Sequence, residues 1–152
     1  MVNKLETRSV SVSSKKNGTT LLAYGLGALA TAVGLGYALV DQIALGGLDE
    51  HLHAMYDPVG KSGEPGPLYG YLYFVGILAL VCWWANSKVV AKGAKSARLW
   101  GWVTFGTAAL AVLPPLVMRE YGETVIPMGL SVGYVLAWVC GLVGVLALRR
   151  SS

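Results

Sequence analysis

Both histidines of the chain lie in one short stretch that also carries several acids. His51 and His53 follow Asp49 and Glu50, and Asp57 comes four residues after His53. Imidazole and carboxylate groups together suit zinc, copper or iron. Residues two apart on a helix do not share a face, so a helical stretch would keep the two imidazoles from one ion. The spacing therefore favours two polar residues on a helix, and His51 and His53 stay as metal candidates only.

Further polar candidates lie at the ends of the apolar runs that flank this stretch. Asp41 closes the first run, Arg119 closes the third, and Glu123 follows four residues after Arg119. Together with Tyr56, these groups can line a pocket that opens on one side of a membrane. They can equally be the solvated ends of spans, where an ion pair contributes little. The pattern leaves both interpretations open.

One aromatic residue stands out at depth in an apolar run. Trp138 lies near the middle of the last run, away from the interfaces where tryptophan is enriched. A tryptophan there can line a site for an apolar ligand, although core packing is its more common role. The other polar or amphipathic groups at depth are Thr31, Thr104, Thr107, Ser131 and Tyr134. The ligand-binding candidates are therefore Asp41, His51, His53, Tyr56, Arg119, Glu123 and Trp138.

No motif for catalysis or for a cofactor accompanies these candidates. The sequence has no GxSxG, HExxH or P-loop motif, so catalytic residues stay unknown and no cofactor is indicated. Cys82 and Cys140 both lie inside apolar runs, which favours buried thiols over a redox pair. The sequence leaves enzymatic activity open but favours a protein without one.

The composition is that of a membrane protein. The chain has 152 residues, of which 55% are hydrophobic and 13% are charged, and its mean hydropathy is +0.57. Soluble domains carry about 25% charged residues, and a soluble chain of this length cannot bury so much apolar surface. The basic residues cluster at the ends of apolar runs, where they indicate membrane topology and not nucleic-acid binding.

Four apolar runs match the ~20 residues that a helix needs to cross a bilayer. We predict an all-α integral membrane protein with spans at about 20–43, 68–88, 98–118 and 126–148. These spans form a single up-down four-helix bundle over residues 20–148, between a polar basic tail at 1–19 and a short tail at 149–152. The central parts of the runs hold no acidic or basic residue, which argues against a proton-coupled transporter.

The loop at 44–67 carries the pattern of a short helix. Leu48, Leu52 and Met55 recur at the spacing of one helical face, and Pro58 follows them. We predict an amphipathic helix at about 48–57 that lies at the membrane surface and acts as a lid or a docking surface.

The basic residues are distributed unevenly over the two sides. Of the twelve lysines and arginines, all but Lys61 and Arg119 fall in the two tails or in the turn at 88–98. Of the eight acids, all but Glu6 fall on the opposite side. The positive-inside rule therefore predicts that both termini are cytoplasmic and that the 44–67 loop is extracytoplasmic. We expect the chain to lie in a bacterial plasma membrane.

The last span carries a stripe of small residues. Gly129, Gly133, Ala137 and Gly141 follow one another at intervals of four. Such a stripe lets helix backbones approach closely. It predicts tight packing against another helix, which can belong to the same chain or to a partner.

Three functions are compatible with these features. The sequence favours a non-catalytic accessory or structural subunit of a larger membrane complex, because the chain is small, has glycine stripes and lacks ionisable groups in its spans. The alternative is an enzyme or ligand-binding protein with an extracytoplasmic site beneath the 48–57 helix. A third hypothesis is a lipid or quinone binder that uses Trp138 and the tyrosines of the second span, Tyr69, Tyr71 and Tyr73. The expected partners are the lipid bilayer and other membrane subunits or a second copy, and no nucleic acid.

Overall fold

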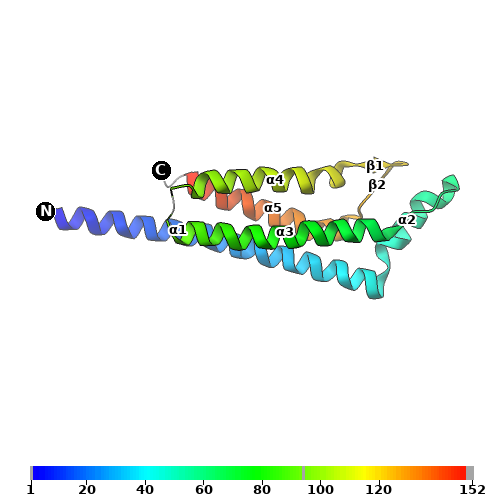
Figure 1. Ribbon diagram of the computed structural model, residues 1–152, viewed down its shortest axis with the longest axis horizontal. Coiled ribbons are helices and arrows are strands. Elements are labelled where there is room, and N and C mark those ends of the chain that lie inside the picture. The colour runs from blue at the N-terminus through cyan, green and yellow to red at the C-terminus, as the bar shows by residue number, and fades with distance from the viewer. Residues whose placement is uncertain (1, 94, 150–152) are drawn as a thin grey trace.

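The computed structural model describes residues 2–93 and 95–149, with the side chains of 18–93 and 95–148. The elements in chain order are α1 (Val2–Val40), the π-helical turn η1 (Asp41–Leu45), α2 (Gly47–Tyr56), the 3₁₀ turn η2 (Asp57–Val59), α3 (Pro65–Ala91), α4 (Ala97–Val117), β1 (Arg119–Glu120), β2 (Glu123–Thr124) and α5 (Met128–Arg149). The long helices run side by side (Figure 1). The start of α1 and the end of α5 lie at one end of the molecule, and α2 and the short strands lie at the other.

Four stretches of the described chain are helices long and apolar enough to cross a membrane. They are Gly18–Leu45, Pro65–Ala91, Ala97–Val117 and Met128–Leu148. The prediction of a mainly helical chain with four membrane-length helices is therefore confirmed. Helix α3, the second of these four long helices, begins at Pro65, a little before the predicted span. A proline is well tolerated in the first turn of a helix, so it can start the helix there.

Helices α1 and α5 approach each other closely at two glycines. A Cβ atom built on Gly133 would lie 2.8 Å from the Cα atom of Gly34 and 3.2 Å from its backbone nitrogen. A Cβ atom on Gly34 would meet the Cα atom of Gly133 at 3.5 Å, which is an ordinary contact, so Gly133 is the position that must lack a side chain. Elsewhere in the stripe, Gly129 lies next to the Tyr37 side chain of α1. The small-residue stripe of α5 thus faces helices of its own chain.

Helix α4 is the loosely held member of the group. It packs against α5 and, less extensively, against α3. Its only buried residues are Ala97 and Gly101, near its first turns, whereas Leu110 is 79% exposed. A long apolar helix with so little buried surface needs lipid as its environment.

Helix α1 begins within the polar N-terminal segment. Residues 2–17 continue α1 as helix, without a break at the membrane-length segment that starts at Gly18. Residues 2–17 hold neither proline nor glycine, so no residue of low helix propensity ends the helix there.

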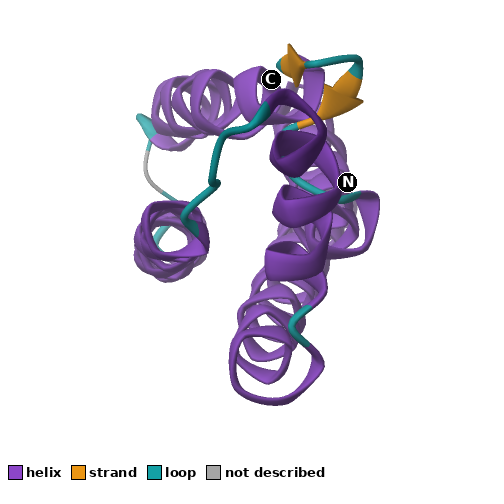
Figure 2. Ribbon diagram, turned by 90° about the vertical axis from the view of Figure 1, so that its right-hand side faces the viewer, coloured by secondary structure: helices purple, strands orange, loops and turns teal. Residues whose placement is uncertain are grey.

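A short hairpin with a two-residue turn follows α4. Strands β1 and β2 pair antiparallel, with Glu120 opposite Glu123. The residues between them, Tyr121 and Gly122, both have positive φ angles of 53° and 94°. Two central residues with positive φ are the signature of the tight turn that suits a twisted hairpin. Figure 2 looks onto this end of the molecule and shows the two strands in orange.

The α1–α5 contact gives a first prediction. Gly133→Ala should lower the midpoint of thermal unfolding in detergent, because its Cβ atom would press on backbone atoms of α1 that cannot move aside. Overpacking of this kind costs about 1–3 kcal/mol. Gly36→Ala is the matched control, because a Cβ atom at Gly36 meets nothing within 4 Å. The midpoint is measured from the loss of the helical circular dichroism signal on heating. Equal midpoints for the two variants would contradict the proposed contact.

Candidate functional site

Asp41 holds the junction between α1, α2 and α3. It lies in the π-helical turn and is 3% exposed. Its carboxylate accepts hydrogen bonds from the backbone N–H groups of Gly47 at 3.1 Å and Leu48 at 3.0 Å, and from the Tyr69 hydroxyl at 2.6 Å. Backbone N–H groups at a helix start favour a negative charge. Asp41 therefore anchors the first turn of α2, and its oxygens are engaged by groups of the chain itself.

The two histidines point to different partners. The Nε2 atom of His51 lies 2.7 Å from the backbone oxygen of Thr124 in β2, which accepts a hydrogen bond from it. His53 is exposed and lies beside Asp49 and Asp57, one turn away on either side. This separation follows from the helical form of α2, since residues two apart face different ways. Within the described residues, no group of three or more His, Cys, Asp or Glu side chains could hold a metal ion.

Aromatic and charged side chains also join α2 to the hairpin. The Tyr56 hydroxyl donates to Glu120 at 2.5 Å, and Lys61 donates to the Tyr121 hydroxyl at 2.6 Å. The Tyr56 and Tyr121 rings meet edge to face, with centroids 5.6 Å apart. The hydrogen bond to the Glu120 carboxylate raises the pKa of Tyr56 above its ordinary value. These contacts are exposed, and they connect the loop after α1 to the loop after α4.

The remaining polar candidates lie on the hairpin surface. Arg119 pairs with Thr124 across the hairpin, and Glu123 pairs with Glu120. The side chains of Arg119 and Glu123 are exposed. Of the candidates from the sequence, the structure thus brings Tyr56 and His51 to the hairpin, while Asp41 is enclosed beneath α2. They do not line one common pocket.

A cavity of about 210 Å³ lies instead at membrane depth between the four long helices. Its lining residues are Tyr24 and Thr31 of α1, one face of α3 from Val75 to Asn86, one face of α4 from Gly101 to Val112, and residues of α5 from Tyr134 to Val145. Trp138 is one of them, so this candidate from the sequence does lie at the cavity. The lining is mostly apolar, as is usual for pockets that bind small molecules.

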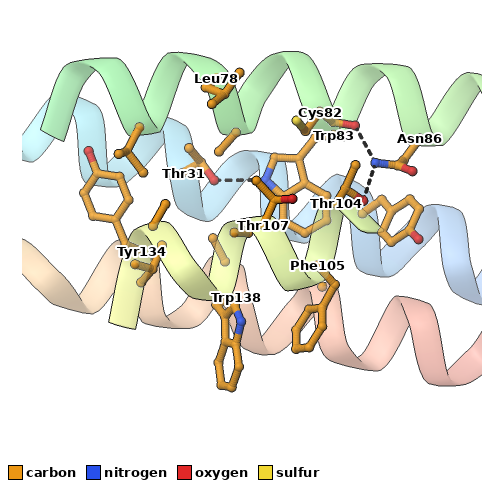
Figure 3. A pocket seen from close by; sticks show the side chains of 18 of the residues that line it. Thr31, Leu78, Cys82, Trp83, Asn86, Thr104, Phe105, Thr107, Tyr134 and Trp138 are labelled. Atoms are coloured by element: carbon orange, nitrogen blue, oxygen red, sulfur yellow. Dashed lines mark hydrogen bonds between the residues drawn. The ribbon is translucent and has the colours of Figure 1, made fainter. Parts of the chain in front are cut away.

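Side-chain hydrogen bonds within the cavity wall hold its helices together (Figure 3). The indole nitrogen of Trp83 donates to the Thr31 hydroxyl at 3.1 Å, which joins α3 to α1. The amide nitrogen of Asn86 donates to the Thr104 hydroxyl at 3.0 Å, which joins α3 to α4, and to the backbone oxygen of Cys82 at 2.9 Å. Hydrogen bonds between spans are worth about 1 kcal/mol each in a membrane.

One polar group in the cavity wall lacks such a partner. Trp138 stacks on Phe105, with ring centroids 5.2 Å apart and planes 20° apart. The Trp138 indole nitrogen is buried without an acceptor in the described structure. A buried polar group without a partner costs about 1–3 kcal/mol, so this position is a favourable place for a ligand oxygen. Tyr24, which is 2% exposed, also lines the cavity, and its hydroxyl lies beside Gly101.

Sequence reasoning missed most of this cavity. Neither Asn86 nor Trp83 was among the candidates from the sequence. Asn86 lies one helical turn after Cys82 on the same face of α3. The residues of α3 that line the cavity recur at intervals of three and four positions, which is the spacing of one helical face. This spacing is the feature of the sequence that could have grouped Asn86 with Trp83 and Cys82.

Comparisons of the chain with models of protein families, with curated protein sequences and with solved structures gave no match.

The His51 contact gives a second prediction. His51→Ala should increase amide hydrogen exchange over residues 118–125, because β2 loses its hydrogen bond to α2. Loss of one hydrogen bond is worth about 1 kcal/mol, or roughly a fivefold change in protection. His53→Ala is the control, since His53 contacts only its own helix and the residue that follows it. The same increase in both variants would rule out a specific anchor at His51.

Proposed function

We propose that this chain is a multi-pass membrane protein that binds an apolar ligand, a lipid or isoprenoid chain, in the cavity between α1, α3, α4 and α5. The observation that carries the proposal is the cavity of about 210 Å³ at membrane depth, with lining from all four helices. Interiors of helical proteins are normally packed without voids much larger than a water molecule. The proposal develops the lipid or quinone hypothesis drawn from Trp138.

The apolar lining of the cavity supports an occupant. The cavity is partly open, and its wall is mostly apolar side chain from all four long helices. An apolar chain can cover this surface without breaking a hydrogen bond of the wall. The exposed flank of α4 gives such a chain a route from the surrounding bilayer.

The ends of the molecule support an orientation in the membrane. We place the start of α1, the α3–α4 turn and the end of α5 in the cytoplasm, and α2 and the hairpin outside the plasma membrane of a bacterium. Charge supports this arrangement, since the basic turn and the acidic loops lie at opposite ends of the described structure (Figure 1). We place α2 at the outer interface, where its residues Leu48, Leu52 and Met55 are buried against the bundle.

The accessory-subunit hypothesis stays a prediction. Two of the sequence features that suggested it now have another explanation. The small-residue stripe of α5 packs on its own chain at Gly34 and Tyr37, so it offers no separate surface to a partner. The 44–67 loop is bonded to the hairpin through His51 and Tyr56. The same bonds occupy groups that an extracytoplasmic enzyme site would need.

Filling the cavity tests the proposal. Ala108→Phe places a ring where Ala108 lines the cavity, and should reduce the apolar ligand that stays bound during purification by about tenfold. Native mass spectrometry of the detergent-solubilised protein measures the ligand. The control is Ala109→Phe, one position along the same helix, since Ala109 does not line the cavity.

A second readout protects this test against misfolding of the variant. Cys82 lines the cavity and Cys140 does not. In a Cys140→Ser background, added ligand should slow the alkylation of Cys82 by N-ethylmaleimide. Equal ligand retention by both phenylalanine variants, together with an unchanged rate at Cys82, would refute the binding function. A co-purifying protein in the same spectra would favour the accessory-subunit hypothesis.

The orientation has a test of its own. Single cysteines at Ser96 and Glu123, in a chain without Cys82 and Cys140, are treated with a membrane-impermeant maleimide. Glu123→Cys should react in intact cells, and Ser96→Cys should react only after lysis, because the basic turn is placed inside. The reverse pattern would invert the orientation.

A further inference from the structure

The cavity is polar at one end and apolar at the other. At the end toward the α3–α4 turn lie Asn86, Thr104 and Tyr24, whose hydroxyl is beside Gly101. At the opposite end the lining includes Val75 and Val112. An occupant that matches this gradient has a polar group at the end near the turn and an apolar chain that runs toward the outer side of the bundle.

The length of the cavity matches one leaflet of a bilayer. Eleven residues separate Val75 from Asn86 along α3, which corresponds to about 16 Å at 1.5 Å per residue. Half of the ~30 Å hydrocarbon core of a bilayer is about 15 Å. The cavity thus has room for part of an acyl chain from the leaflet whose headgroups lie beside the α3–α4 turn.

The turn beside the polar end is positively charged. Lys88, Lys92, Lys95 and Arg98 are all exposed there. Arg98 precedes the lining residues Gly101 and Phe105 by three and seven positions, so it belongs to the same face of α4. The acids of the described side chains lie on η1, on α2 and the loop after it, and on the hairpin, at the other end of the bundle. Basic groups at a membrane surface each attract an anionic lipid by about 1 kcal/mol.

We infer that the ligand is an anionic phospholipid. Its phosphate lies at the α3–α4 turn among Lys88, Lys92, Lys95 and Arg98, and one acyl chain occupies the cavity. The glycerol and ester oxygens then lie at the depth of Asn86 and Tyr24, the polar side chains at that end of the cavity. This inference rests on the proposed binding function, and it adds the charge of the headgroup and the leaflet from which the lipid comes.

The test compares lipids that differ only in their headgroups. Delipidated full-length protein is titrated in detergent with phosphatidylglycerol or with phosphatidylcholine of the same chains, and bound lipid is counted by native mass spectrometry. We expect phosphatidylglycerol to bind about tenfold more tightly, and the double variant K88Q/K92Q to lose that preference. The control K61Q/R119Q removes the same charge at the other end of the bundle and should keep the preference. Glycerol phosphate, which lacks chains, should not compete.

Different outcomes separate the inference from the function on which it rests. Equal binding of the two lipids, with both weakened by Ala108→Phe, overturns the anionic headgroup and leaves the binding cavity in place; a neutral quinone would behave in this way. A preference for phosphatidylglycerol that Ala108→Phe leaves intact shows lipid on the outer surface only, and overturns both. Loss of the preference in K61Q/R119Q as well shows a general charge effect, and overturns the assignment to the turn.

Discussion

The contact between the backbones of Gly34 and Gly133 is the constraint on which the rest of the structure depends. In a bilayer, apolar side chains gain nothing by leaving lipid for another helix, so close packing and hydrogen bonds must hold the spans together. Helices α1 and α5 achieve this by direct backbone contact. Helix α3 joins them through larger groups, such as Leu35 against Gly76 and Trp83 against Gly27. Helix α4 is buried only at Ala97 and Gly101, near its first turns, so a space remains along its later turns, and that space is the cavity.

A buried carboxylate organises the end of the bundle that carries α2. Asp41 would be costly at a membrane boundary without partners. The wide π-helical turn rotates it inward, where two N–H groups of α2 and one tyrosine hydroxyl receive it. The same bonds fix the direction in which α2 leaves the bundle. Leu48 and Leu52 can then pack into the core with exposures of 0% and 2%.

The parts of the fold that follow from local rules could be predicted, and the parts that depend on which helices meet could not. The four spans follow from length and hydropathy, and the position of α2 follows from the spacing of Leu48, Leu52 and Met55. The small-residue stripe on α5 predicted close packing against another helix. It could not show which helix, because many helix faces can pack closely against small residues. The candidate site beneath the 48–57 helix was inferred because its polar residues lie close together in the sequence or at the ends of neighbouring spans. In the folded chain His51 and Asp41 have different partners on different elements, and a list of residue types holds no information on such pairings.

The cavity was hidden for the same reason. A void is a property of several helices at once, and no single span shows it. Trp138 was singled out from the sequence because of its depth, and it does line the cavity. Asn86 and Tyr24 were not, because near the end of a span a polar or aromatic side chain fits the interface equally well. Only the arrangement of α3 against α4 shows that they face a common space.

The spans are unequal in length, and this has a consequence for the bilayer itself. The apolar segment Gly18–Leu45 has 28 residues and Ala97–Val117 has 21, which correspond to about 42 Å and about 32 Å at the rise of an α-helix. Figure 1 shows α1 inclined relative to α4, as a long span must be to match a hydrocarbon core of ~30 Å. The shorter α4 matches such a core without tilting, so lipids around the protein would meet two different hydrophobic heights. Mismatch of this kind sorts proteins between membranes of different thickness, and it makes this chain sensitive to the acyl-chain length of its host membrane.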